Sequence, residues 1–140
     1  MSDEPARLVI STAIPGDEAI YLRVSPEVAD DLQALMEEQG VFESRALEHA
    51  AGPELAILIA SFGTVGGLHG IAAAMSAWFQ RNEHKSVTLT RGHETLELHG
   101  LSRSDREAVV DRFLADAHQV QLKRNEEWMR LSESDDESGV

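Results

Sequence analysis

The chain has 140 residues, of which 42% are hydrophobic, a formal net charge of −13 and no cysteine. This length fits one domain, and the hydrophobic content is enough for an ordinary core, which excludes a wholly disordered chain. The lack of cysteine excludes disulfides, thiolate metal sites and cysteine nucleophiles. The acidic charge argues against nucleic-acid binding, because phosphate backbones are repelled.

The N-terminal part predicts a ββα unit over residues 7–40, preceded by a flexible lead at residues 1–6. The lead lacks the basic and apolar regions of a secretory signal, so none is expected. Two runs rich in β-branched residues, Arg7–Ile14 and Ala19–Val24, flank a Pro-Gly-Asp-Glu turn. This arrangement predicts an antiparallel hairpin.

A helix is predicted next, because Ser25 is a residue type that caps free N–H groups and Pro26 suits the first helical position. Gly40 is a typical stop signal. The buried face would carry four apolar residues at helical spacing, namely Val28, Leu32, Leu35 and Met36. The residues that follow, 41–51, fit either a short strand or a second helical piece.

The segment Leu55–Phe79 runs for 25 residues without Asp, Glu, Lys or Arg. We interpret it as a central Gly/Ala-rich helix over residues 53–81. Three environments remain open for this helix: a bilayer, which about 20 apolar residues can span, the core of a domain, or an interface with another subunit. Four glycines, His69 and a thin basic flank disfavour the bilayer.

Small residues spaced four apart on this helix would let a second helix approach closely. We therefore predict a contact surface for another copy or a protein partner. Its predicted members are Gly63, Gly67, Leu68, Gly70, Ile71, Ala74 and Trp78.

A second ββα unit is predicted over residues 86–131. Ser86–Thr90 and Glu94–Leu98 alternate apolar with polar residues, as a half-buried hairpin does. Ser104 and Glu107 have the spacing of a capping box, which predicts a helix from there to about residue 130. Residues 132–140 form an acidic low-complexity segment that we expect to be disordered.

Together these elements predict an α+β fold in one domain, residues 7–131. Two ββα units would form a mostly antiparallel four-stranded sheet, with the apolar helix between them in the sequence.

The sequence offers no catalytic or cofactor motif. The six histidines (His49, His69, His84, His93, His99 and His118) form no pair with metal-ligand spacing, so we predict no metal and no cofactor. Within the apolar segment, His69 would be a buried neutral imidazole that needs a hydrogen-bond partner. The glycine-rich run at residues 63–70 lacks the Lys and Ser/Thr of a phosphate-binding loop.

One resemblance covers residues 50–120. An apolar Gly/Ala-rich segment ends in Ala77-Trp78-Phe79-Gln80-Arg81, and SVTLTRGHETLELHGLS and a closing helix follow. This order resembles the effector-associated constant component proteins of actinobacteria and related bacteria. The resemblance implies an accessory component of a bacterial conflict or defence system that acts as an adaptor beside a separate effector. It supplies no catalytic residues.

We therefore expect a cytoplasmic, non-enzymatic adaptor or assembly module that self-associates or docks an effector protein. One alternative is a single-pass membrane-anchored component that uses residues 55–79 as its transmembrane helix. Another is a small enzyme with a polar site between sheet and helices, using His69 or His99.

Overall fold

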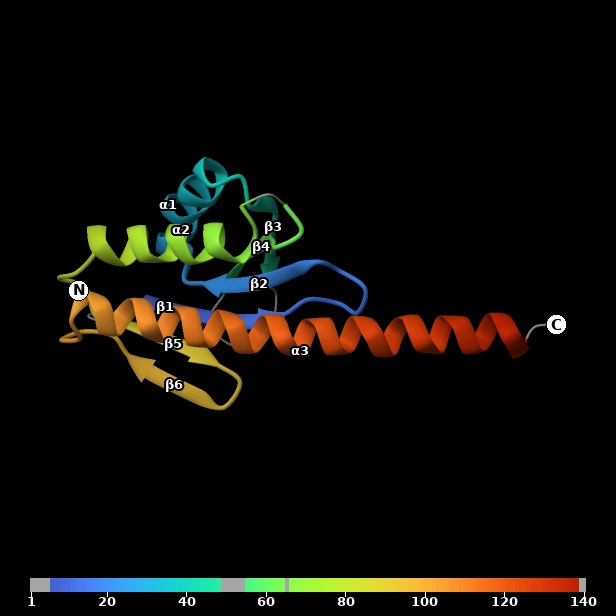
Figure 1. Ribbon diagram of the computed structural model, residues 1–140. Helices are drawn as coiled ribbons and strands as arrows, with labels where there is room; N and C mark the ends of the chain where they lie inside the picture. Colours follow the sequence, from blue (N-terminus) through green and yellow to red (C-terminus); the bar gives the residue numbers. More distant parts are fainter. Residues whose placement is uncertain (1–5, 49–54, 65, 139–140) are drawn as a thin grey trace.

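The computed structural model describes residues 6–48, 55–64 and 66–138. Along the chain, each helix follows a pair of strands. Their order is β1 (Ala6–Thr12), β2 (Ala19–Val24), α1 (Pro26–Glu38), β3 (Phe42–Glu48), β4 (Leu55–Ser61), α2 (Gly67–Arg81), β5 (Val87–Arg91), β6 (Glu94–Glu97) and α3 (Arg103–Ser138). All six strands belong to one sheet with the order β3-β4-β2-β1-β5-β6 (Figure 1). The predicted α+β class is confirmed.

The predicted four-stranded, mostly antiparallel sheet is wrong in its details. Strand β1 lies in the middle of the sheet, where Leu8 is opposite Val24 of antiparallel β2 and opposite Leu89 of parallel β5. The other neighbouring pairs are antiparallel. The two predicted hairpins therefore join through a parallel contact, and β3 and β4 extend the sheet beyond β2. A strand was one of the two alternatives for residues 41–51, whereas β4 lies in the segment that we predicted to be helical.

The apolar segment is not one helix. Its first part is strand β4, in which Ala56, Leu58 and Ala60 are buried and the residues between them are half-buried. This strand pairs with β2 on one side and β3 on the other. An interior strand is apolar on both faces, and a short apolar run of this kind cannot be told from a helix by its periodicity. Helix α2 begins only at Gly67, where φ is +50°.

This division of the segment also removes the helix on which the membrane alternative depended. Within residues 6–48, 55–64 and 66–138, no helix combines the length and apolarity that crossing a bilayer requires.

The first ββα unit has the predicted elements. Pro26 begins α1, and Gly40 follows it with φ +71° while Val41 N donates to Met36 O at 3.1 Å, as in a glycine-terminated helix. The predicted cap is different, however. The side-chain oxygen of Ser25 accepts from Arg7 N at 2.9 Å and so joins the end of β2 to β1 instead of capping α1.

The second unit differs at both ends of its helix. Ser102, not Ser104, caps α3, since Ser102 Oγ accepts from Asp105 N at 3.1 Å. Helix α3 then continues to Ser138, through most of the segment that we expected to be disordered. The predicted lead covered residues 1–6, but Ala6 begins β1. Residues 1–5, the predicted helix start at Pro53, His49 and residues 139–140 lie outside the described residues.

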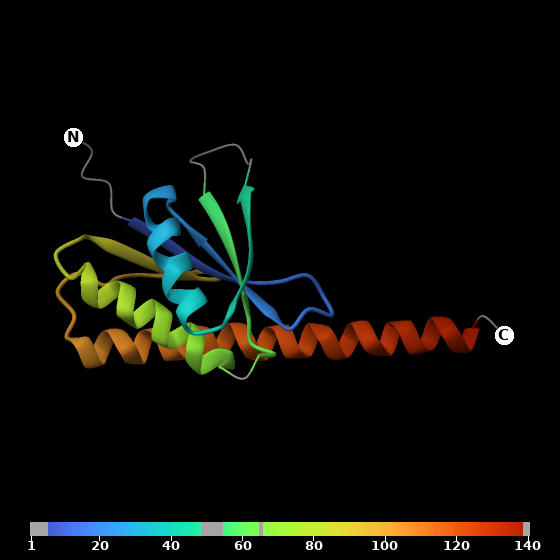
Figure 2. The ribbon, with the colours of Figure 1, turned by 90° about the horizontal axis from the view of Figure 1, so that it is seen from above.

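One face of the sheet carries the core. The alternating residues of β1, β2, β4 and β5 on this face are buried, and all three helices pack there (Figure 2). Helix α2 lies between α1 and α3, and α3 crosses β1 and β2. Both views show α3 running on past the end of the sheet.

Candidate interaction surface

The predicted contact residues lie mostly inside the protein. Gly70, Ile71, Ala74 and Trp78 are buried by the chain itself, while Gly63 and Gly67 belong to the connection before α2 and to its first residue. Leu68 is half-buried. The small residues serve packing within one chain, because α2 is held between α1 and α3. We therefore place the contact surface elsewhere.

Gly70 shows this internal role most directly. A Cβ atom at this position would lie 2.8 Å from Val41 Cγ1, closer than Cβ atoms are found in proteins. The missing side chain lets α2 approach the segment that follows α1. The space that we predicted for a second helix is thus taken by the Val41 side chain of the same chain.

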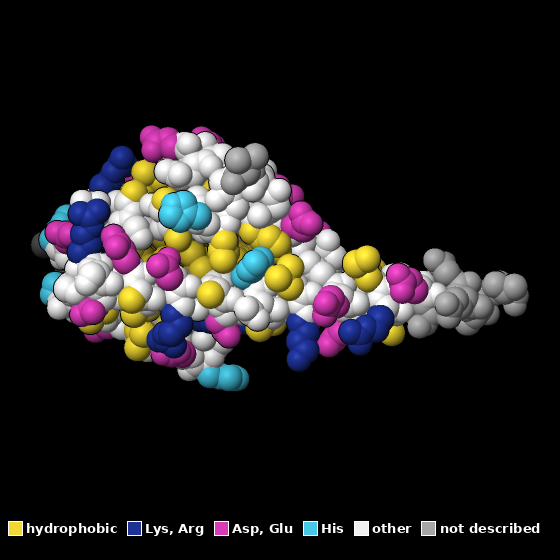
Figure 3. Space-filling model, viewed as in Figure 1, with side chains coloured by type: hydrophobic (Ala, Val, Ile, Leu, Met, Phe, Trp, Pro, Cys, Tyr) yellow, Lys and Arg dark blue, Asp and Glu magenta, His cyan; other side chains and the backbone are white. Residues whose placement is uncertain are grey.

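A groove of about 280 Å³ runs between α2 and α3. It is lined by Leu68, His69, Ala72, Asp111 and Leu114. Figure 3 shows hydrophobic side chains gathered in the hollow between these helices. His69 and Asp111 are exposed at this groove, so the prediction of a buried His69 is wrong.

The other histidines that the structure describes do not gather at this groove as a metal site. His99 lines a separate small depression beside Arg106, and the ring of His118 packs edge-on against Phe62 with centroids 4.6 Å apart. Across the described ranges, no three His, Asp or Glu side chains are grouped in a way that could hold a metal ion.

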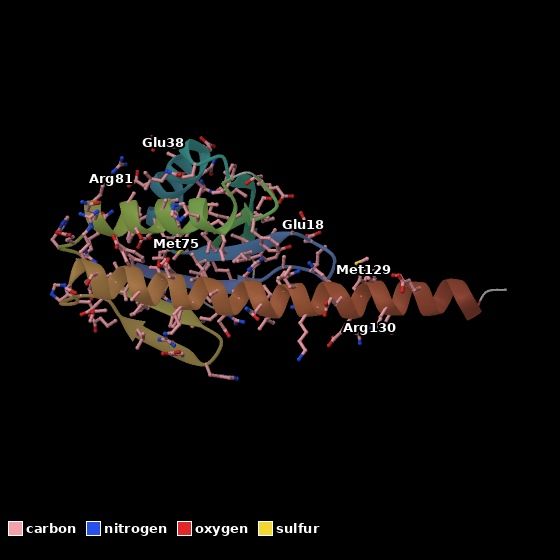
Figure 4. All side chains as sticks on the ribbon, in the orientation of Figure 1. Glu18, Glu38, Met75, Arg81, Met129 and Arg130 are labelled. Atoms are coloured by element: carbon pink, nitrogen blue, oxygen red, sulfur yellow. The ribbon has the colours of Figure 1, made fainter. Side chains whose placement is uncertain are left out.

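The largest exposed apolar side chains gather at one end of the molecule. Of the side chains that the structure describes, six large hydrophobic ones are exposed: Ile14 (59%), Val120 (38%), Leu122 (45%), Trp128 (52%), Met129 (62%) and Leu131 (63%). Five belong to α3, between residues 120 and 131, and Ile14 belongs to the β1–β2 turn beside it. We call this set the apolar end. Figure 4 places Met129 and Arg130 on the part of α3 beyond the turn that carries Glu18.

A buried amide fixes the β1–β2 turn to α3. Gln121 is fully buried, its Oε1 accepts from Ala13 N at 2.8 Å and its Nε2 donates to Ile14 O at 2.9 Å. One helical turn later, Asn125 Oδ1 accepts from Gly16 N at 2.6 Å and Asn125 Nδ2 donates to Asp17 O at 2.9 Å.

These two amides satisfy backbone groups that a turn otherwise leaves to water. The indole of Trp128 packs on the same turn, since a Cβ at Gly16 would lie 3.3 Å from Trp128 Cδ1. The base of the apolar end is therefore anchored to the β1–β2 turn, although α3 projects beyond the sheet.

Comparison with known proteins does not assign this surface. No protein-family model, curated protein or solved structure matches the chain.

The resolved pKa shifts lie away from the apolar end, where α3 meets the β5–β6 hairpin. Arg112 donates to both carboxylate oxygens of Glu94, at 2.9 and 2.8 Å. This charge-assisted hydrogen bond lowers the pKa of Glu94 and raises that of Arg112. Both groups are solvent-exposed, so the pair orients the hairpin and makes no reactive centre.

Sequence reasoning missed the apolar end, although a signal for it was present. Trp128, Met129 and Leu131 stand in a run of charged residues that otherwise reads as a solvated helix. The charged residues pointed to an exposed helix, and three large apolar side chains on such a helix indicate a contact surface. The buried amide of Gln121 had no comparable signal, because its partners are backbone groups more than 100 residues away.

Proposed function

We propose that this protein is a non-enzymatic adaptor or assembly module that contacts another protein chain through its apolar end. The observation that carries this proposal is the gathering of the six exposed large hydrophobic side chains at α3 and the adjoining turn. Large apolar side chains exposed together on one projecting helix mark a candidate interaction site. Aromatic residues and methionine are also enriched at protein interfaces.

The anchored base of this end supports the same proposal. A surface that is already ordered by Gln121 and Asn125 loses little conformational entropy when a partner binds. The groove between α2 and α3 is a weaker candidate for a functional site, since its polar groups are one exposed imidazole and one exposed carboxylate.

The biological setting of the proposal comes from the resemblance over residues 50–120. We propose a cytoplasmic accessory component of a bacterial conflict system, acting beside a separate effector protein. Mass-spectrometric identification of the contacted chain tests this setting, and cell fractionation tests the location.

Site-specific photocrosslinking in the native host tests the contact itself. A benzophenone amino acid replaces Met129 in one variant and Arg103, an exposed residue at the other end of the same helix, in a control. We expect protein adducts from position 129 and few from position 103. The absence of adducts at position 129, or equal yields from both positions, would contradict the proposed surface.

A further inference from the structure

We propose that a basic amphipathic helix of a partner protein docks along the groove between α2 and α3 and continues over Leu122 and Met129. This inference rests on the proposed function, because it names the partner segment and the side of the apolar end that this segment contacts. We call the surface the docking track. Its members are Leu68 and Ala72 of α2 and Leu114, His118, Leu122 and Met129 of α3.

The α3 side chains of the docking track form one line. Leu114 lines the groove, and His118, Leu122 and Met129 follow it along the helix. At about 100° per residue, these four side chains leave α3 within an arc of about 80°. Figure 4 shows Met129 and Arg130 on different sides of the helix. The apolar lining of the groove therefore continues along α3 to the apolar end.

The other exposed apolar side chains of α3 point elsewhere. Val120 and Leu131 leave the helix about 145–165° away from the middle of the docking track. Trp128 lies between the two sides, where its indole packs on Gly16 of the β1–β2 turn. One straight helix cannot cover both sides of α3, so Val120 and Leu131 lie outside the docking track.

The shape of the docking track fits a helix better than an extended peptide. From Leu114 to Met129 it is about 22 Å long, or about four turns of a facing helix. Its apolar side chains form a ridge of the kind that packs into the groove of another helix. An extended peptide would place unpaired backbone N–H and C=O groups on this apolar surface, whereas a helix pairs its own.

Acidic side chains accompany the docking track along α3. Asp111 lines the groove, and Glu126 and Glu133 leave the helix within about 75° of the middle of the track. Within residues 111–133, all of which the structure describes, every Lys and Arg side chain leaves α3 more than about 110° away. This side of the helix therefore presents carboxylates without neighbouring cations on the same side.

A further carboxylate lies on the α2 side of the docking track (Figure 4). Glu18 is exposed, and its carboxylate lies against Gly63, where a Cβ atom would overlap it. Phe62 N donates to Glu18 O at 3.0 Å, and the Phe62 ring packs on His118. Carboxylates on both sides attract Lys and Arg and repel acidic segments and anionic lipid headgroups. The partner helix therefore carries apolar side chains on one face and basic ones on its flanks.

Binding of a designed peptide to the full chain gives the first test. The probe is a fluorescent helical peptide of about 18 residues, with Leu on one face and Lys on the other. A matched peptide carries Glu in place of Lys. Fluorescence anisotropy should show binding of the Lys peptide and at least about tenfold weaker binding of the Glu peptide. No binding of the Lys peptide at submillimolar protein, or equal binding of both peptides, overturns the inference.

Two double variants locate the bound peptide. Leu122→Ser with Met129→Ser removes apolar side chains from the docking track, and Val120→Ser with Leu131→Ser removes similarly exposed ones from the other side of α3. We expect the first double variant to raise the Kd of the Lys peptide about tenfold and the second to change it less than about twofold. Circular dichroism checks that both remain helical. Equal effects on Kd overturn the inference.

A pair of neighbouring carboxylates tests the charge argument. Glu126→Gln removes an exposed carboxylate beside the docking track, and Glu127→Gln removes one from the far side of α3. The first change should weaken binding of the Lys peptide about two- to threefold and the second should weaken it less, because water and salt screen the more distant charge. Equal weakening would show that only the net charge of the chain attracts the peptide, and would overturn the placement.

Photocrosslinking in the native host identifies the occupant. A benzophenone amino acid at position 122 should give protein adducts, and one at position 120 should give few. Mass-spectrometric mapping should place the adducts in a partner segment with apolar residues at helical spacing and an excess of Lys and Arg. Adducts to a second copy of this chain, or to an acidic segment, overturn the inference.

These results can be separated from a failure of the proposed function. If position 129 gives adducts in cells but the two double variants weaken peptide binding equally, the docking track is wrong and the contact surface stands. If position 129 gives no adduct and the Lys peptide does not bind, both are wrong.

Discussion

Gln121 Oε1 accepts a hydrogen bond from Ala13 N at 2.8 Å, and the two residues are 108 positions apart in the sequence. The bond joins the turn after the first strand to the last helix. It lies inside the protein, because Gln121 is fully buried. This one side chain therefore connects the β1–β2 hairpin to the base of the projecting helix.

Replacing Gln121 with Leu should destabilise the fold. The change leaves a backbone N–H of Ala13 and a carbonyl of Ile14 without their amide partner, and an unsatisfied buried group costs about 1–3 kcal/mol. Urea unfolding should show this loss as a lower midpoint. Gln119→Leu on the exposed side of α3 is the matched control. Equal midpoints for the two variants would show that the buried amide contributes no stability.

Gly70→Ala should also lower the free energy of unfolding, and the size of this loss should depend on the side chain at position 41. The new methyl group would overlap Val41 Cγ1, and overpacking of this kind costs about 1–3 kcal/mol. In a Val41→Ala background the overlap is gone, so the same change should become neutral or stabilising by up to about 1 kcal/mol, as Gly→Ala within a helix is. A double-mutant cycle measures this coupling. If Gly70→Ala costs the same in both backgrounds, the contact is not responsible.

The ion pair between Glu94 and Arg112 should give a small pH-dependent stabilisation. Arg112 holds the pKa of Glu94 below its ordinary value of 4.5. Its contribution is therefore present above the unfolded pKa and is lost as the pH falls through the lower folded pKa. Glu94→Gln should lower the thermal midpoint relative to wild type at pH 7, and by less at pH 3. Glu126→Gln, an exposed control on α3, should show no such difference between the two pH values.

The two tryptophans should report separately on the core and the apolar end. Trp78 is 1% exposed and Trp128 is 52% exposed. In Trp78→Phe the remaining indole should be accessible to iodide, whereas in Trp128→Phe the remaining indole should be protected. Equal iodide quenching of the two variants would contradict this difference in exposure.

Sequence patterns predicted the elements whose signals are local. The β1–β2 hairpin, α1 with its stop at Gly40, and the β5–β6 hairpin follow from alternation, turn residues and helical spacing. The middle of the chain was misassigned because Leu55–Ser61 is apolar on both faces, and only its pairing with β2 and β3 makes it a strand.

The candidate surface was predicted less well than the fold. Gly70 and Ala74 do allow close approach, but the approaching atoms belong to the same chain, and sequence spacing cannot distinguish the two cases. The charged residues around Trp128 and Met129 indicated an exposed helix, but only the structure shows that this part of α3 lies past the end of the sheet. Beyond that end, Met129 and Leu131 have no sheet to pack against.

The parallel pairing of β1 with β5 has a consequence for synthesis of the chain. Leu8 pairs with Leu89, so the second edge of β1 has no partner until residues 87–91 have left the ribosome. At about 5–20 residues per second, synthesis from Leu8 to Leu89, 81 positions later, takes roughly 4–16 s. During that interval the nascent chain presents an open edge formed by Ala6–Ile10. A newly made chain is therefore most exposed to misassembly, or to capture by a chaperone, at the strand that ends up in the middle of the finished sheet.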